Sequence, residues 1–84
     1  MNLLVARTEV IARQLISAAN LPRDQWLARS VGGALLGHQL DVVLWLVDEP
    51  SDRDPTYEMY QGYRNHAITK LKPGGQFFES ELPL

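Results

Sequence analysis

A short apolar segment in the middle of the chain constrains the fold more than any other feature. Residues 41–47 read DVVLWLV and are apolar on every side after the first residue, so their periodicity is compatible with a buried helix and with a buried strand. The three valines favour a strand, for which residues 76–82 are the one plausible partner. Because two strands alone make a marginal sheet, we favour the helix.

The segments before this one predict two helices. Residues 4–19 place their apolar side chains on one helical stripe, and Asn20, followed closely by Pro22, predicts the end of that helix. Pro22 also suits the first position of a second helix, which we expect to run to Val47. Its glycines then need an explanation, either a bend or close packing against another helix; they are Gly32, Gly33 and Gly37.

A third helix is expected from Asp54, as its N-cap, to about Leu71. Its buried stripe should contain Tyr60, Tyr63, Ala67 and Leu71, and Gln61 should face outward. The predicted fold is therefore an all-α three-helix bundle. The alternative is an α+β fold with a two-stranded element at about 42–47 and 76–82. In the favoured version the 84 residues form a single helical domain, with residues 76–84 as a C-terminal tail.

Composition indicates the broad class of protein. Apolar residues make up 45% of the chain, which is enough for a core. The net charge of −2 argues against nucleic acid as the ligand, because such domains usually carry a basic excess. The absence of cysteine excludes disulfides and thiolate metal ligands. The apolar run 34–47 is too short to span a membrane, so we expect a cytoplasmic protein with no membrane partner.

The predicted second helix leads to a hypothesis about oligomeric state. About 26 residues at 1.5 Å each span roughly 39 Å, whereas a domain of this size is roughly 30 Å across. A second copy of the chain could cover the excess apolar surface. We therefore predict a homodimer in which Gly33, Gly37 and Trp45 pack between the copies.

No set of residues predicts catalysis. Ser30 precedes Val31-Gly32-Gly33 without the Gly-x-Ser-x-Gly frame of a nucleophile elbow. His38 and Asp41 have the spacing of two ligands on one helix face, but two ligands are too few for zinc. We therefore predict no catalytic residues, no metal, no cofactor and no enzymatic activity.

Aromatic and charged side chains favour a surface that binds another protein. Tyr57, Tyr63 and Arg64 belong to the types that anchor protein interfaces, although Tyr63, like Tyr60, also suits a core position with its hydroxyl at the rim. An acidic loop precedes them in the chain and contains Asp48, Glu49, Asp52 and Asp54. The predicted function is a small non-enzymatic protein-binding module, an adaptor, regulator or inhibitor of another protein, that acts as a homodimer and uses these seven residues to bind its partner.

Two other functions are considered. Two helices joined by the short turn at residues 20–22 could form part of a helix-turn-helix in a nucleic-acid-binding regulator. Residues 38–46, HQLDVVLWL, resemble the second acidic helix of the MazG-like nucleotide pyrophosphohydrolases, which implies a magnesium-dependent nucleotide hydrolase. His38 stands where that family has a metal-binding Glu, and Glu9 is the one acidic residue in the first predicted helix, so we do not carry the activity over.

Overall fold

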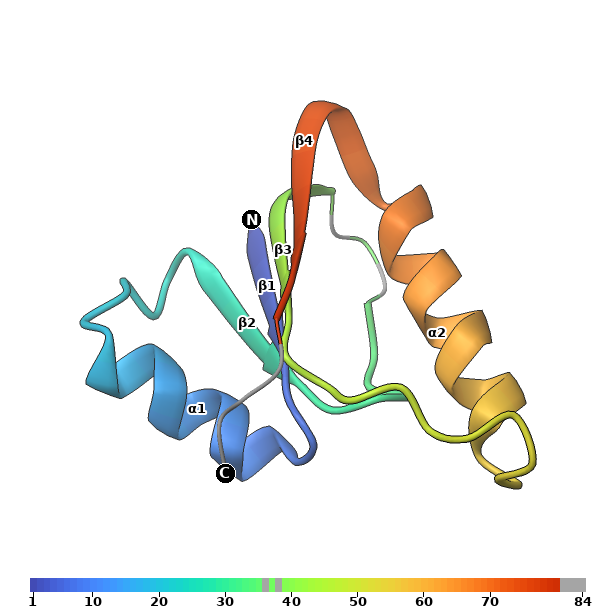
Figure 1. Cartoon of the computed structure of the whole chain (residues 1–84). Helices are drawn as coiled ribbons and strands as arrows, with labels where there is room; N and C mark the ends of the chain where they lie inside the picture. The colour runs from blue at the N-terminus through green and yellow to red at the C-terminus, as the bar shows by residue number, and fades with distance from the viewer. Residues whose placement is uncertain (36, 38, 81–84) are drawn as a thin grey trace.

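The computed structural model describes residues 1–35, 37 and 39–80, and these residues form an α/β fold (Figure 1). The elements, in chain order, are β1 (Asn2–Val5), α1 (Glu9–Ala18), β2 (Trp26–Arg29), β3 (Leu40–Trp45), α2 (Tyr57–Thr69) and β4 (Leu71–Glu79). The described part of the chain thus contains four strands and two helices. The prediction of an all-α three-helix bundle is wrong.

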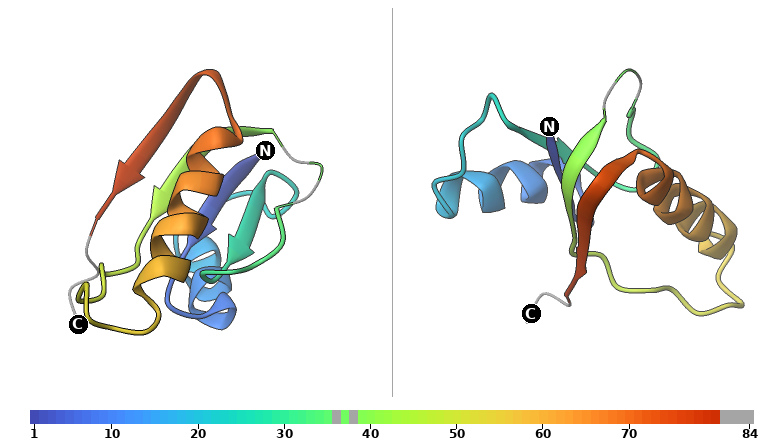
Figure 2. Two further views of the ribbon diagram at one scale, coloured as in Figure 1. Left: turned by 90° about the vertical axis from the view of Figure 1, so that its right-hand side faces the viewer. Right: turned by 90° about the horizontal axis from the view of Figure 1, so that it is seen from above.

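The strands form one sheet in the order β2-β1-β3-β4, and every neighbouring pair is parallel. β1 lies inside the sheet, where Leu3 is opposite Leu27 of β2 on one side and Val43 of β3 on the other. Val43 is in turn opposite Phe77 of β4. The helix α1 lies on one face of the sheet and α2 on the other, as the right-hand view of Figure 2 shows.

The apolar segment 41–47 is an interior strand and its continuation. Val43 and Trp45 face α2, whereas Leu44 packs into the cluster on the α1 side. Parallel strands that are covered on both faces have continuous apolar sequences, which is why this segment shows no alternation. The pairing of β3 with β4 that the alternative prediction included is present, but β1 supplies a second partner and the sheet is larger than two strands.

The core is divided by the sheet into two layers. On the α2 side, Trp45 is fully buried and contacts the rings of Tyr60, Tyr63 and Phe77, with centroid distances of 5.4, 6.0 and 6.1 Å. The smaller layer on the α1 side has the following buried residues: Leu4, Ala6, Ala12, Ile16 and Ala28. Both layers depend on β1, since consecutive residues of that strand point to opposite faces.

The first predicted helix is partly confirmed. Its residues 9–18 form α1, but Leu4 and Val5 belong to β1. Thr8 separates the two elements, because its Oγ1 accepts a hydrogen bond from the Ile11 amide at 3.1 Å and so caps the helix. The predicted stop is also present: the helix ends at Ala18, and Asn20 has a left-handed backbone with φ of 54°.

The second predicted helix, from Pro22 to Val47, is wrong. This part of the chain contains β2, a connecting loop and β3. Glycine is needed in the loop for backbone geometry, since Gly32 and Gly37 have φ values of 92° and 75°. Gly33 is needed for close packing within the chain, because a Cβ there would lie 2.8 Å from Cδ of Arg29.

The third predicted helix is confirmed with shorter bounds, Tyr57–Thr69. Three residues of its predicted stripe, Tyr60, Tyr63 and Ala67, are buried in the helix, whereas Leu71 begins β4. Asp54 lies before the helix rather than at its N-cap, which is Thr56. The predicted tail begins inside β4, and residues 81–84 lie outside the described part of the chain.

Two of the functional alternatives lose their structural premise. The helix that would complete a helix-turn-helix after residues 20–22 is replaced by the strand β2. The segment that resembles a MazG-like helix is β3 over residues 40–45, and His38 lies outside the described residues. Neither alternative is proposed below.

Candidate functional site

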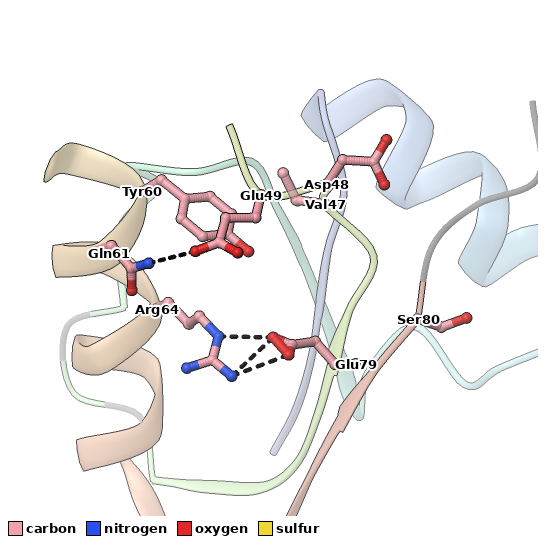
Figure 3. A pocket seen from close by; sticks show the side chains of 8 residues that line it. All are labelled: Val47, Asp48, Glu49, Tyr60, Gln61, Arg64, Glu79 and Ser80. Carbon is pink, nitrogen blue, oxygen red and sulfur yellow. Dashed lines mark hydrogen bonds and ion pairs between the residues drawn. The ribbon is translucent and has the colours of Figure 1, made fainter. Parts of the chain in front are cut away.

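A cleft of about 460 Å³ opens at the carboxyl ends of β3 and β4, beside the first half of α2 (Figure 3). In open parallel sheets, ligands bind outside the carboxyl ends of the strands, because the connecting loops meet there. The cleft is lined by Val47, Asp48, Glu49, Tyr60, Gln61, Arg64, Glu79 and Ser80. Three separate segments therefore build it: the end of β3 with its loop, α2, and the end of β4.

One wall of the cleft is an ion pair between α2 and β4. The Arg64 guanidinium donates from Nε to Glu79 Oε1 at 2.8 Å and from Nη2 to Glu79 Oε2 at 3.0 Å (Figure 3). The same guanidinium lies 5.0 Å from the centre of the Phe77 ring, within range of a cation–π contact. This bidentate ion pair, together with the stacking on Phe77, holds the side chains of Arg64 and Glu79 in one geometry.

The opposite wall joins the loop after β3 to α2. Gln61 Nε2 donates to Glu49 Oε1 at 2.8 Å and to the Tyr57 hydroxyl at 3.1 Å. These bonds orient one carboxylate oxygen of Glu49 toward the helix. They leave the negative charge of Glu49 uncompensated, since Gln61 and Tyr57 are neutral.

Tyr60 connects the cleft to the core. Its hydroxyl accepts a hydrogen bond from Trp45 Nε1 at 3.0 Å, and the two rings meet edge to face at an angle of 76°. Burial raises the pKa of Tyr60 above its ordinary value, and the hydrogen bond with Trp45 lowers it to a smaller extent. The phenol stays protonated at neutral pH, so its O–H remains a hydrogen-bond donor.

The charges of the cleft do not cancel. Arg64 and Glu79 neutralise each other, and Asp48 and Glu49 then give the cleft a net negative charge. Asp48 is exposed and makes no hydrogen bond or ion pair with the described part of the chain. A cleft with a net negative charge attracts cations.

The structure brings together three of the seven residues predicted to bind a partner, since Asp48, Glu49 and Arg64 line the cleft. Tyr57 lies beside it through the Gln61 bond. Tyr63 is only 8% exposed and belongs to the core.

The remaining two predicted residues lie in the loop before α2. Asp52 is exposed there. Asp54 accepts hydrogen bonds from the Thr56 hydroxyl at 2.7 Å and from the Thr56 amide at 2.8 Å, and these bonds lower the pKa of Asp54. Asp54 therefore shapes the start of α2 and does not line the cleft.

Sequence reasoning missed four polar residues of the cleft: Tyr60, Gln61, Glu79 and Ser80. The helical stripe predicts a core position for Tyr60 and an exposed position for Gln61. Glu79 and Ser80 belonged to a predicted tail. These residues could have been identified from the position of the strand end, but that position is known only when the fold class is correct.

The predicted dimer-packing residues have other roles within one chain. Trp45 is fully buried in the core and has no surface left for a second copy. Gly33 packs on Arg29, and Gly37 supplies a turn with positive φ. The helix that was to bring these three residues to one surface does not exist.

A second hollow, of about 360 Å³, lies between α1 and β2 and contains three arginines. Each is already bonded within the chain. Arg13 binds Glu9 at 2.8 Å, Arg23 binds the Ser17 hydroxyl at 3.3 Å, and Arg29 binds the Ala34 carbonyl oxygen at 2.8 Å. We therefore place the candidate site at the carboxyl ends of β3 and β4.

Comparison of the chain with models of known protein families, with curated proteins and with solved structures gave no match. In residues 1–35, 37 and 39–80, no three His, Cys, Asp or Glu side chains gather where they could share a metal ion. Neither helix of the described chain has the length and apolar character needed to cross a bilayer. The absence of an enzymatic activity, of a metal and of a cofactor, like the cytoplasmic location, stays a prediction from the sequence.

Proposed function

We propose that this chain is a non-enzymatic protein-binding module, an adaptor, regulator or inhibitor, whose cleft holds a basic side chain of a partner protein. The single observation that carries the proposal is the uncompensated pair of carboxylates, Asp48 and Glu49, at a cleft whose other charges are paired. Arginine and lysine are the protein groups that complement such a site.

The walls of the cleft support this assignment because they are already ordered. Glu49 is held by Gln61, and Glu79 by Arg64. Binding costs less when the receiving groups do not have to be immobilised. The Tyr60 hydroxyl and the exposed Ser80 add polar groups beside the carboxylates, which suits a guanidinium with its several donors.

The test is a selection of displayed random peptides on the immobilised chain, followed by affinity measurement on the enriched peptides. We expect the enriched peptides to contain Arg or Lys at a recurring position. The variant Asp48→Asn with Glu49→Gln should bind them at least tenfold more weakly, or about 1.4 kcal/mol. Gln at position 49 keeps an acceptor for Gln61, so the wall is preserved.

A matched control carries the same change in net charge at other sites. Asp24→Asn with Glu58→Gln removes two exposed carboxylates that do not line the cleft, and this variant should bind like the unmodified chain. Enriched peptides without a basic residue, or equal losses in both variants, would contradict the proposal.

Arg64 is a poor choice for the decisive variant. Its replacement by Ala removes the partner of Glu79 and uncovers Phe77, so it alters the wall of the cleft as well as its charge. The two carboxylates can be neutralised without that disturbance.

A further inference from the structure

β4 is an edge strand of the sheet, and one side of its backbone has no neighbour within the described chain. The Ser80 amide donates to the Trp45 carbonyl oxygen at 3.0 Å, so Ser80 faces β3. Alternate residues of a strand direct their N–H and C=O groups to opposite sides. Phe77 and Glu79 therefore present these groups to the open edge, where a further strand can pair with them.

The apolar residue on this edge is Phe78, which is 50% exposed. Phe78 lies opposite Leu44 in the sheet, and Leu44 belongs to the layer on the α1 side. The helix α1 packs on β1 and β2, and Figure 2 shows it at the far side of the sheet from β4. Phe78 is consequently uncovered on a strand whose backbone edge is also open.

We propose that two copies of this chain form a symmetric dimer through antiparallel pairing of their β4 strands, centred on Phe78. In this register Phe77 of one copy pairs with the partner's Glu79, and the reverse pair is made by symmetry. All four residues then use the outward N–H and C=O groups described above. The two Phe78 residues face each other at the two-fold axis in a non-hydrogen-bonded pair, with Cα atoms about 4.5 Å apart.

Charge complementarity on the α2 face favours a second copy over an unrelated strand. The partner's Glu79 lies opposite Phe77, with Cβ atoms about 5 Å apart in a directly opposed pair. Arg64 stacks on that same Phe77 ring at 5.0 Å. Each guanidinium thus gains a second carboxylate from the other copy, while the Phe78 rings cover each other on the opposite face.

The pairing is limited to the end of β4. Pro73 lacks the amide hydrogen that a longer ladder would need, and Gly74 has φ of 83°. Residues 76–80 remain for the contact. The dimer contact shares Glu79 and Arg64 with one wall of the cleft, but it does not use Asp48 or Glu49, so its test does not depend on the ligand that the cleft binds.

Sedimentation equilibrium of the full chain over a range of concentrations tests the association. We expect the mass to rise toward twice that of one chain, and Phe78→Asp to hold it at the mass of one chain. Val10→Asp is the matched control, since Val10 is 59% exposed and lies on α1; it should associate like the unmodified chain. A chain that keeps the mass of one copy at every concentration overturns the proposal.

Cysteine crosslinking tests the register and does not require a variant that abolishes association. The chain has no cysteine, so each variant with a single cysteine substitution carries one thiol. Phe78→Cys should oxidise to a covalent dimer, because opposed Cα atoms in the proposed pair lie within disulfide range. Gln76→Cys lies on the same face of β4, but symmetric copies of residue 76 are about 13 Å apart in this register, so it should stay uncrosslinked. Equal crosslinking of both variants overturns the register.

Discussion

The three tyrosines of α2 differ in what their hydroxyls contact, and this difference predicts three different effects of the same chemical change. Tyr60 accepts a buried hydrogen bond from Trp45 Nε1. The Tyr63 hydroxyl is buried without a hydrogen-bond partner among the described residues. Tyr57 is half-buried, and its hydroxyl accepts a bond from Gln61, which also binds Glu49. Replacement of each by Phe removes one oxygen and keeps the ring.

Tyr60→Phe should destabilise the fold most. The change leaves the Trp45 N–H buried without an acceptor, and Trp45 itself is fully buried. Loss of one partner of a buried hydrogen bond costs about 1–3 kcal/mol. For a domain of this size a loss of about 2 kcal/mol lowers Tm by roughly 8–16 °C.

Tyr63→Phe should have the opposite sign. A buried hydroxyl without a partner is unfavourable, so its removal is expected to raise the free energy of unfolding by about 1 kcal/mol and Tm by roughly 4–8 °C. Tyr57→Phe should change the free energy of unfolding by less than about 0.5 kcal/mol, the usual range for surface changes.

Thermal and urea unfolding of the three variants, followed by circular dichroism, give the measurement. The order of stability should be Tyr63→Phe, then the unmodified chain and Tyr57→Phe together, then Tyr60→Phe. A Tyr60→Phe variant as stable as the unmodified chain would refute the reasoning, because the Trp45 bond would then contribute nothing. A strongly destabilised Tyr63→Phe would show that its hydroxyl has a partner that holds it.

Two further effects follow from the same contacts and from the loops. Burial raises the pKa of Tyr63 to about 12, whereas the ordinary value is near 10. The phenol therefore ionises at lower pH in the unfolded chain than in the folded one, and the free energy of unfolding falls as the pH rises from about 10 toward 12. Because Tyr63→Phe lacks this ionisation, its alkaline unfolding should be weaker. Among the glycines, Gly62→Ala should stabilise α2 by about 0.5–1 kcal/mol because nothing lies within 4 Å of the added Cβ. Gly32→Ala should destabilise by about 1–3 kcal/mol, as φ at Gly32 is 92°. Urea unfolding of the two alanine variants should show shifts of opposite sign, and shifts of equal sign would contradict this.

The sequence patterns that involve only neighbouring residues gave correct predictions. The stop at Asn20 and the buried stripe of α2 are both present. These features depend on contacts within a few residues, which the sequence displays directly. The predicted boundaries that failed are those of the segments that form strands.

The fold class failed because strand β1 is short and lies at the start of the chain. Its residues Leu4 and Val5 continue smoothly into the stripe of α1, so the stripe predicts a helix that starts at residue 4. Without β1, the segment 41–47 had one possible partner and was read as a helix. Strand pairing joins residues about 40 positions apart here, and no local pattern records it.

The candidate site was predictable in its chemistry but not in its shape. Asp48, Glu49 and Arg64 were selected for their residue types. Their convergence requires the carboxyl ends of β3 and β4 to lie side by side with α2 above them. Glu79, which holds Arg64, could be found only once β4 was known to be a strand.

The location of β1 has a consequence for how the molecule forms. During synthesis this interior strand emerges first, yet its neighbours β2 and β3 are made about 20 and 40 residues later. Contacts between such distant residues close slowly, because loop entropy is lost before the contacts form. Leu3, Leu4 and Val5 of β1 therefore stay unpaired until β2 has been made, and they gain their second neighbour only when Leu40–Trp45 has followed.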